Sequence, residues 1–195
     1  MPDWNPGVDQ MAKKVVLLIA GLCGSGKTTA ARIFRLQGIP VVRMGDATDR
    51  FLNSKSKKIN ETNERRARRE LREKFGQDYY ARESLPKIKK ELAGRKLLAL
   101  EGLRSEEERL VFSGEFVDCR LLYLESSRKL RIKRLVMRKN RPLKKEQIIL
   151  RERYERESLG THRLKKKADY LVKNDGRLES FHEKIRQIIE RLKND

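Results

Sequence analysis

The chain of 195 residues has few cysteines, histidines and aromatic side chains. Its two cysteines, Cys23 and Cys119, and its two histidines, His162 and His182, have no spacing typical of a zinc site and imply no disulfide framework. No apolar run approaches the length of a membrane span, and no secretion signal precedes the first expected strand. These absences favour a protein of the reducing cytoplasm without a membrane partner.

Positive charge, in contrast, is in excess. The chain carries 48 Lys and Arg against 28 Asp and Glu, a net charge of +20. Such an excess attracts polyanions such as nucleotides, RNA or anionic lipid, and the alternative is a generally basic surface with no dedicated partner. The length suits one domain with a real core. We expect a flexible tail over residues 1–13 and a single domain over residues 14–195, as a monomer or weak oligomer.

The segment Gly21-Leu-Cys-Gly-Ser-Gly-Lys-Thr28 fits G-x-x-x-x-G-K-[ST], the phosphate-binding loop. Its N–H groups would converge on an anion at a helix N-terminus. Lys27 is expected to reach the β- and γ-phosphates, and the Thr28 hydroxyl to ligate Mg²⁺. We predict ATP and Mg²⁺ as cofactors, bound by Gly21, Cys23, Gly24, Ser25, Gly26, Lys27, Thr28 and Thr29.

The flanking sequence has the order that this loop requires. Residues 15–20 form a continuous apolar run, typical of a strand buried on both faces. Residues 29–37 have a helical pattern that Gly38 and Pro40 terminate. This context disfavours the alternative, an ordinary strand–turn–helix with no ligand.

Two further expected strands end in acidic residues. Residues 40–46 end in Asp46, and ligands of open parallel sheets bind beyond the carboxyl ends of the strands. Asp46 could orient or deprotonate an acceptor hydroxyl, or simply cap a helix. Residues 96–104 resemble a Walker B strand, with Glu101 in place of the usual Asp to act through Mg²⁺ or its waters. Arg104 could clamp a substrate phosphate, or form a surface ion pair with Glu106, Glu107 or Glu108.

Residues 47–95 are expected to form a helical acceptor-binding segment. The pattern is strongly charged, with opposite-charge pairs at helical spacing, and Gly76 is expected to break it. Four arginines are candidates to hold an anionic acceptor, although the charge run favours a solvated helix face for each of them: Arg65, Arg68, Arg69 and Arg82.

Residues 127–160 are expected to form a lid, after a fourth strand over 119–125. A helix over 128–141, ended by Pro142, places Arg131, Arg134 and Arg138 near one face, and a helix over 145–158 carries more arginines. Such a lid excludes water and neutralises charge that develops during phosphoryl transfer. The rival is an RNA-binding basic hairpin, which should carry aromatics to stack bases, but only Tyr154 lies here.

The C-terminal part completes the expected sheet. Residues 168–176 predict a fifth strand, after which Asn174 could border a purine ring or form a plain turn. Residues 178–192 carry an apolar stripe that predicts a helix packed on the sheet. The predicted architecture is therefore a three-layer α/β/α P-loop NTPase with a five-stranded parallel sheet, a helical substrate segment and a helical lid.

With these residues placed, the chain resembles the nucleoside-monophosphate-kinase group of P-loop proteins, dephospho-CoA kinases and an uncharacterised kinase-like P-loop family above all. The resemblance runs from about Lys13 to Asn194. It rests on the phosphate loop and on the segments 42–46, 101–104, 134–138 and 168–176. It implies that Asp46 serves the acceptor and that Arg138 serves the phosphates.

The sequence therefore predicts a phosphotransferase that moves the γ-phosphoryl of Mg-ATP to a small nucleotide-like acceptor, a nucleoside monophosphate or dephospho-CoA. The catalytic residues would be Lys27, Asp46 and Arg138, with Arg134 and Asn174 also on the nucleotide. Asp46 and Arg104 would bind the acceptor, and Thr28 and Glu101 the metal. The alternatives are an RNA-associated P-loop NTPase or polynucleotide kinase, and a nucleotide-binding regulatory switch.

Overall fold

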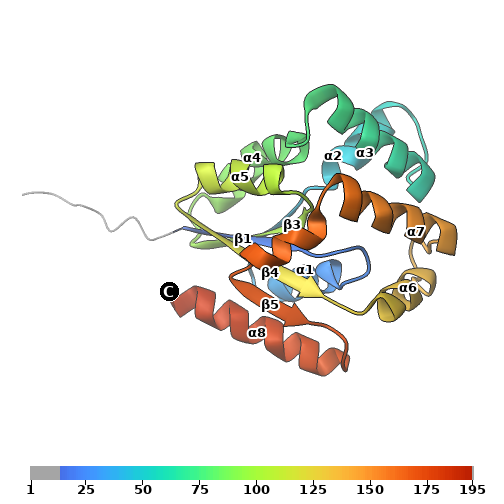
Figure 1. Cartoon of the computed structure of the whole chain (residues 1–195). Helices are drawn as coiled ribbons and strands as arrows, with labels where there is room; N and C mark the ends of the chain where they lie inside the picture. The colour runs from blue at the N-terminus through green and yellow to red at the C-terminus, as the bar shows by residue number, and fades with distance from the viewer. Residues whose placement is uncertain (1–13, 195) are drawn as a thin grey trace, which may run out of the picture.

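A computed structural model describes residues 14–194 of the chain, and these form a five-stranded parallel sheet between helices (Figure 1). The predicted tail over residues 1–13 lies outside the described residues. The strand order is β2-β3-β1-β4-β5, so the first strand is central. The strands are β1 (Val15–Ala20), β2 (Val41–Arg43), β3 (Leu97–Leu103), β4 (Asp118–Glu125) and β5 (Tyr170–Lys173).

Helices cover both faces of this sheet, which confirms the predicted three-layer architecture (Figure 1). α1 and α8 pack on one face, and α4, α5 and η2 pack on the other. The helices are α1 (Lys27–Leu36), α2 (Asp46–Ser54), α3 (Glu61–Phe75), α4 (Tyr79–Leu92), α5 (Glu106–Glu115), α6 (Arg128–Val136), α7 (Lys145–Arg153), the π-helix η1 (Tyr154–Ser158), the 3-10 helix η2 (Thr161–Lys167) and α8 (Leu178–Asn194).

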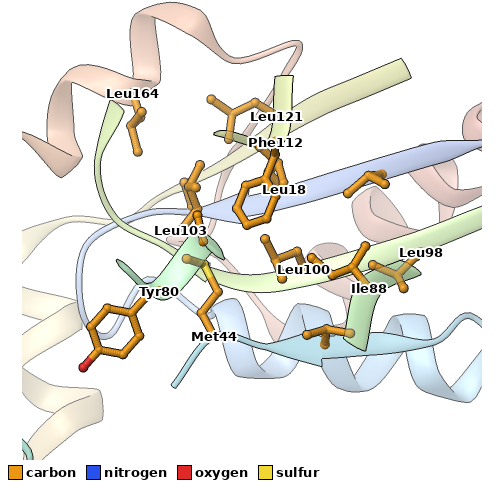
Figure 2. Close-up of a cluster of buried hydrophobic side chains, with 14 of the residues drawn as sticks. Leu18, Met44, Tyr80, Ile88, Leu98, Leu100, Leu103, Phe112, Leu121 and Leu164 are labelled. Atoms are coloured by element: carbon orange, nitrogen blue, oxygen red, sulfur yellow. The ribbon is translucent and has the colours of Figure 1, made fainter. Parts of the chain in front are cut away.

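The central strand β1 contributes side chains to two hydrophobic cores, one on each face of the sheet. All six of its residues are buried, and because alternate side chains of a strand point to opposite faces, the strand feeds both layers. Val16, Leu18 and Ala20 join the core beneath α4 and α5, shown in part in Figure 2, whereas Val15, Leu17 and Ile19 join the core beneath α1 and α8. This double burial accounts for the continuous apolar run in the sequence.

Local capping residues set several helix boundaries. The Asn60 side chain accepts a hydrogen bond from the main-chain N of Asn63 at the start of α3. Gly76 ends that helix with a positive φ of 100°, as the predicted break requires. Ser105 caps α5 in the same way as Asn60, accepting from the main-chain N of Glu108. The chain therefore passes from the end of β3 directly into the start of α5.

Three segments differ from the sequence expectations. β2 covers only Val41–Arg43, because Gly45 already caps α2 and Asp46 is the first residue of that helix. The helix expected over 128–141 ends at Val136, since the chain folds back to bury Leu143 beside Leu135. The helix expected over 145–158 changes to π geometry from Tyr154 onward. Helices α5 and η2 were not predicted.

Candidate active site

The glycine-rich loop joins β1 to α1 at the carboxyl end of the central strand. Gly24 and Gly26 have φ values of 81° and 109°, a backbone region that residues with a side chain rarely adopt. A Cβ on Gly26 would collide with the Asn174 side-chain amide, and one on Gly24 would lie 2.8 Å from the Arg131 carbonyl oxygen. The loop therefore needs glycine both for its backbone and for the elements packed against it.

Lys27 begins α1 and its ammonium group turns back over the loop. Nζ donates to the carbonyl oxygens of Gly21 and, over 3.1 Å, of Leu22. Burial lowers the pKa of Lys27 to about 8; the Glu155 carboxylate opposes this shift, and Arg104 adds to it. The group is still mostly protonated at neutral pH and is held by neutral carbonyls, which a phosphate can replace.

Thr28 and Glu101 come together as the sequence suggested. The Thr28 hydroxyl donates to Glu101 Oε1 over 2.7 Å, because β3 pairs directly with β1. A hydroxyl and a carboxylate are hard oxygen ligands, and Mg²⁺ is commonly held by one or two such groups together with phosphate oxygens and waters. Residues 14–194 contain no cluster of three His, Cys, Asp or Glu able to hold a metal alone. The donor set thus fits Mg²⁺ bound jointly with a phosphate.

A cavity of about 450 Å³ extends from the phosphate loop toward α3 and the lid. Nine basic and five acidic side chains line it, so its wall carries a positive excess. Six of the eight residues predicted to bind ATP and Mg²⁺ from the loop line this same cavity, together with Glu101, Arg104, Arg134 and Arg138; the six are Cys23, Gly24, Gly26, Lys27, Thr28 and Thr29. The structure therefore brings most of the predicted site to one place.

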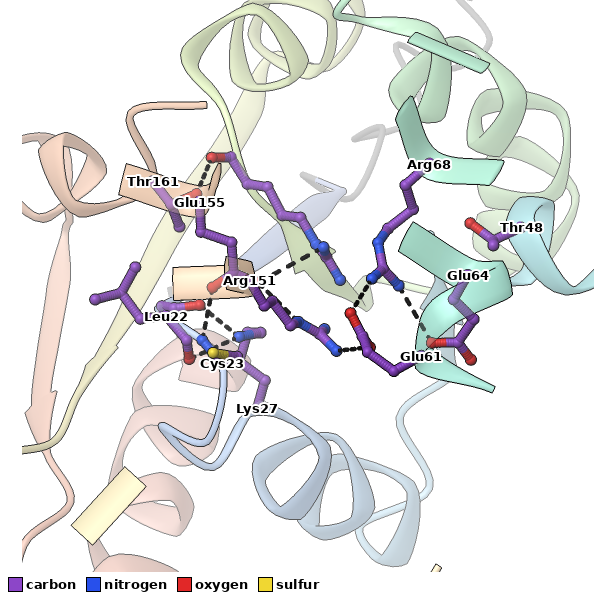
Figure 3. A network of polar contacts seen from close by, with 12 residues as sticks. Leu22, Cys23, Lys27, Thr48, Glu61, Glu64, Arg68, Arg151, Glu155 and Thr161 are labelled. Carbon is purple, nitrogen blue, oxygen red and sulfur yellow. Dashed lines mark hydrogen bonds and ion pairs between the residues drawn. The ribbon is translucent and has the colours of Figure 1, made fainter. Parts of the chain in front are cut away.

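Alternating charges cross the cavity wall between α3 and α7, as Figure 3 shows. Glu61 accepts from Arg151 over 2.8 Å and from Arg68 over 2.6 Å. Arg68 also donates to Glu64 over 3.2 Å. Arg141, after α6, donates to the second oxygen of Glu64 over 2.6 Å. These ion pairs connect the acceptor-binding segment predicted over residues 47–95 to the lid.

The predicted lid, residues 127–160, is also attached to the phosphate loop. Glu155 of η1 is 1 % exposed and accepts a hydrogen bond from the main-chain N of Cys23 over 2.8 Å. Arg131 of α6 donates to the Cys23 carbonyl oxygen over 3.2 Å and to Glu152 over 2.7 Å. Arg131, predicted on the lid's arginine face, is therefore a buried structural residue, and both main-chain groups of Cys23 are bonded to the lid.

A second cavity of about 200 Å³ lies beside the loop. It is bordered by Gly26, Thr29, Arg134, Asn174, Gly176 and Leu178. Arg134 donates to the Asn174 carbonyl oxygen over 2.9 Å, and the Asn174 amide donates to Ser25 O over 2.9 Å. The turn after β5 is therefore hydrogen-bonded to both the phosphate loop and α6. The sequence suggested that a purine ring, or only a plain turn, lies beside Asn174.

Asp46 lies at the edge of the site. Its carboxylate accepts from Arg43 over 2.9 Å and from Lys87 over 3.2 Å, and it is not among the residues that line the cavity. Asp49, one helical turn later, does line the cavity and pairs with Arg43. Gly45, not Asp46, occupies the capping position of α2.

The arginines of α3 and α4 separate into two kinds. Arg68 faces the cavity with its side chain 8 % exposed. Arg69 and Arg82 are mostly exposed and pair with Glu73 and Asp78 on their own or the adjoining turn, as a solvated helix face requires.

Sequence reasoning missed several residues of the cavity wall. Arg72 and Tyr80 line the cavity, and Glu155 contacts the loop. Arg151 was expected only as one of the lid arginines and Glu108 only as a possible surface partner of Arg104, yet both line the cavity. The spacing of Arg151 and Glu155 by four residues was visible in the sequence, but it is common on exposed helices. No motif distinguishes these buried charges from the many solvated ones.

The fold and the phosphate loop together define a P-loop kinase-like protein. Among solved structures, the chain is similar to a dephospho-CoA kinase from Campylobacter jejuni, with a TM-score of 0.56, 16 % identity, and coverage of 92 % of this chain and 97 % of that one. It is similar to a shikimate kinase from Acinetobacter baumannii, with a TM-score of 0.55, 21 % identity, and coverage of 93 % and 96 %. At these identities the likeness concerns the fold.

The family is shown at the level of sequence. A family profile described as "AAA domain" matches residues 17–160, and the chain belongs to that family. It also belongs with the UPF0200 proteins: it is 35 % identical to one from Methanoculleus marisnigri, across 91 % of this chain and 96 % of that one. A "UPF0200/UPF0201 protein" of Archaeoglobus fulgidus is 36 % identical across 91 % of this chain, which spans 55 % of that relative's length. Among the described residues, no helix has the length and apolar character to cross a bilayer.

Proposed function

We propose that the protein is a kinase that transfers the γ-phosphoryl group of Mg-ATP to a small nucleotide-like acceptor. One observation carries this proposal: a single cavity joins the phosphate loop, through Lys27 and Thr28, to a wall of arginines on α3 and the lid. Phosphoryl transfer depends mainly on positioning and on neutralising the phosphate charges. A phosphate loop that opens into a cationic, partly enclosed cavity supplies both.

The residues around the loop have distinct proposed roles. The N–H groups of the loop and the Lys27 ammonium would hold the β- and γ-phosphates in place of the carbonyls that Lys27 now contacts. Mg²⁺, held by the Thr28 hydroxyl and served by Glu101, would offset charge on the phosphate oxygens. Arg138 of the lid would neutralise charge on the transferred group.

The nucleoside would lie in the second cavity. The loop after β5, with Asn174, and the guanidinium of Arg134 border this space directly beside α1. A planar guanidinium stacks well on a purine ring, and main-chain groups of a turn can read its edge.

Two carboxylates of the protein are candidates to act on the acceptor. Asp46 is the residue that the sequence and the resemblance favour, whereas Asp49 is the carboxylate in the cavity wall. Either would accept the proton of an attacking hydroxyl, after release from Arg43.

An acceptor screen with γ-labelled ATP tests the proposal. The purified protein is incubated with Mg-ATP and, separately, with nucleoside monophosphates, dephospho-CoA and RNA. We expect label transfer to a small acceptor, complete loss of transfer in Lys27→Ala, and unchanged transfer in Lys184→Ala, an exposed lysine on α8. Transfer that survives Lys27→Ala would contradict the kinase assignment. Label on RNA alone, lost steeply with added salt, would favour the macromolecular alternative.

A further inference from the structure

The predicted lid contains a stretch of chain that is rich in cations and free of acids. Residues 126–145, which include α6 and the turn into α7, hold ten Lys and Arg and no Asp or Glu. Four of these cations belong to the interior or to the main cavity: Arg131, Arg134, Arg138 and Arg141. The other six are exposed to solvent: Arg128, Lys129, Lys133, Lys139, Lys144 and Lys145.

The exposed lysines of this stretch are not paired with acids of other elements. Within residues 14–194, only Arg128 among the six exposed cations forms an ion pair, with Glu152 at 3.2 Å. Exposed cations on other helices have acids at helical spacing, as Arg69 has Glu73. The lysines of residues 126–145 therefore leave their charge open to an anionic partner.

Apolar side chains are exposed between these lysines. Val136 is 41 % exposed and Met137 is 69 % exposed. On the neighbouring helix α7, Ile149 and Leu150 are 50 % and 46 % exposed. Four of the ten large apolar residues exposed within residues 14–194 thus belong to this small part of the molecule. Apolar surface beside open positive charge is typical of an interaction site.

The inward side of the two helices is already packed. Leu135 of α6 packs with Leu143 and with Ile148 of α7 in a small core. Arg131, on the same side of α6 as Leu135, is buried as well. The two helices lie together at one end of the molecule (Figure 1).

The outward side of α6 carries the exposed groups. Lys129, Lys133 and Val136 follow one another at spacings of four and three residues, so they share the side of the helix away from its buried residues. Met137 and Lys139 come directly after the helix and are exposed. We call these five residues the basic lid face.

The composition of the basic lid face favours a lipid surface over other anionic partners. A second copy of this chain would bring like charges together. Single-stranded RNA is bound by aromatic side chains on which its bases stack, and the face has none. At a bilayer surface, in contrast, lysines lie at anionic head groups while aliphatic side chains enter the boundary with the acyl chains.

We propose that the basic lid face docks on an anionic lipid bilayer, with its lysines at the head groups and Val136 and Met137 in the acyl boundary. The inference goes beyond the proposed kinase activity and does not depend on it. It departs from the sequence expectation of no membrane partner, because that expectation rested on spanning segments, which contact with a bilayer surface does not need.

Co-sedimentation of the full chain with sucrose-loaded vesicles tests the proposal. Vesicles of equal parts phosphatidylglycerol and phosphatidylcholine are compared with vesicles of phosphatidylcholine alone. We expect binding to the anionic vesicles at about 50 mM salt, roughly tenfold or more weaker binding at about 500 mM, and little binding to the neutral vesicles. No binding to the anionic vesicles at low salt would overturn the inference.

A double variant tests the lysines. Lys129→Gln with Lys133→Gln removes two charges from the face and should weaken binding to the anionic vesicles about 10- to 30-fold. Lys57→Gln with Lys58→Gln is the matched control, because both lysines are exposed between α2 and α3 and the net charge falls equally. Equal vesicle binding by the two double variants would show that the basic lid face is not the docking surface.

Met137→Gln separates a bilayer from a soluble polyanion. It should weaken binding to the anionic vesicles about 3- to 10-fold, because an apolar side chain no longer enters the acyl boundary. Leu36→Gln, at the exposed end of α1, is the control and should bind vesicles like the unaltered protein. Vesicle binding that Met137→Gln leaves unchanged would contradict insertion of the face and overturn the inference.

Oligouridine and poly-glutamate are titrated in parallel as probes for RNA and for an acidic protein. We expect both to bind more weakly than the anionic vesicles and to be insensitive to Met137→Gln. Either probe bound more tightly than the vesicles, and weakened by Lys129→Gln with Lys133→Gln, would assign the face to that class of partner instead.

Discussion

The Glu155 carboxylate accepts a hydrogen bond from the main-chain N of Cys23 over 2.8 Å, which joins a π-helix of the lid to the phosphate loop. The two residues are 132 positions apart in the chain. The same carboxylate faces Arg151 at 3.3 Å and Arg104 at 3.6 Å. Single-turn π segments occur often at functional sites, and this one places a buried acid beside the loop. The predicted lid is therefore hydrogen-bonded directly to the phosphate loop.

Glu155 is expected to make stability depend on pH in acid. Burial alone would raise its pKa, but Arg104, Arg151 and Lys27 lower it to about 2. A carboxyl group whose pKa is lowered on folding stabilises the folded protein at pH values above its unfolded pKa of 4.5. This contribution of about 3 kcal/mol is lost as the pH falls toward 2. Denaturant unfolding of the unaltered protein and Glu155→Gln should differ most above pH 5 and converge near pH 2.

Glu157→Gln is the control for this experiment. Glu157 lies two residues on, with its side chain 63 % exposed and paired with Arg153, so its loss should change the free energy of unfolding little at any pH. A gap between Glu155→Gln and the unaltered protein that stays constant from pH 6 to pH 2 would show that the charge of Glu155 is not its source.

Gly26→Ala should disable the phosphate loop. A Cβ there would overlap the Asn174 amide, and the φ of 109° is unfavourable for alanine. We expect a loss of roughly 1–3 kcal/mol in stability and a strong loss of nucleotide binding. Gly114→Ala, in α5 with open space around it, should instead stabilise by about 0.5–1 kcal/mol. Thermal unfolding and fluorescent-nucleotide titration measure both, and equal behaviour of the two variants would refute the argument.

The buried pair Arg131–Glu152 should be costly to break from one side. Both side chains are nearly inaccessible, at 2 % and 6 % exposure, and lie 2.7 Å apart. Arg131→Met should cost about 3–5 kcal/mol because it leaves a buried carboxylate with weaker partners. Arg128→Met removes an exposed partner of the same carboxylate and should cost about 0–1 kcal/mol.

A double-variant cycle separates the pair from its surroundings. Arg131→Met with Glu152→Met should cost less than the sum of the two single changes, because the double variant leaves no uncompensated charge. Strict additivity in equilibrium unfolding would mean that the two residues do not stabilise each other.

Glu101→Gln should raise the Mg²⁺ requirement. The carboxylate accepts from the Thr28 hydroxyl, and an amide would support a metal ion on that oxygen less well. We expect the Mg²⁺ concentration for half-maximal nucleotide affinity to rise about 10- to 100-fold. Glu125→Gln, at the end of β4 and paired with Lys165, lies outside the cavity and should leave the Mg²⁺ titration unchanged.

Asp46→Asn and Asp49→Asn should show which of the two carboxylates accepts the proton of the acceptor. The acting residue should lower kcat by about 10²- to 10⁴-fold with little change in nucleotide affinity, which is the usual contribution of a general base. Steady-state kinetics with the acceptor found in the screen gives the answer. An equal, small effect of both would assign proton removal to neither.

Much of the fold was predictable because its signals are local. Residues 15–20 are apolar without alternation, and only a strand covered on both faces requires that pattern. Gly76 and Asn60 mark a helix end and a helix start through their own backbone and side-chain chemistry. The early end of α6 was not predictable in this way, because it depends on the burial of Leu143 against residues on other elements.

The candidate site likewise has one part that local sequence predicts and another that depends on contacts between distant residues. The phosphate loop is contiguous, a motif of eight residues in a row, so the sequence alone was enough to identify the loop and to predict where a polyphosphate would bind. Whether an arginine is solvated, buried in an ion pair or left with free donors depends on partners distant in the chain. Arg69 and Arg72 are three positions apart, yet the first is exposed beside Glu73 and the second is buried over Tyr80. Only the tertiary structure decided between them, since burial and electrostatic pairing are properties of the packed chain.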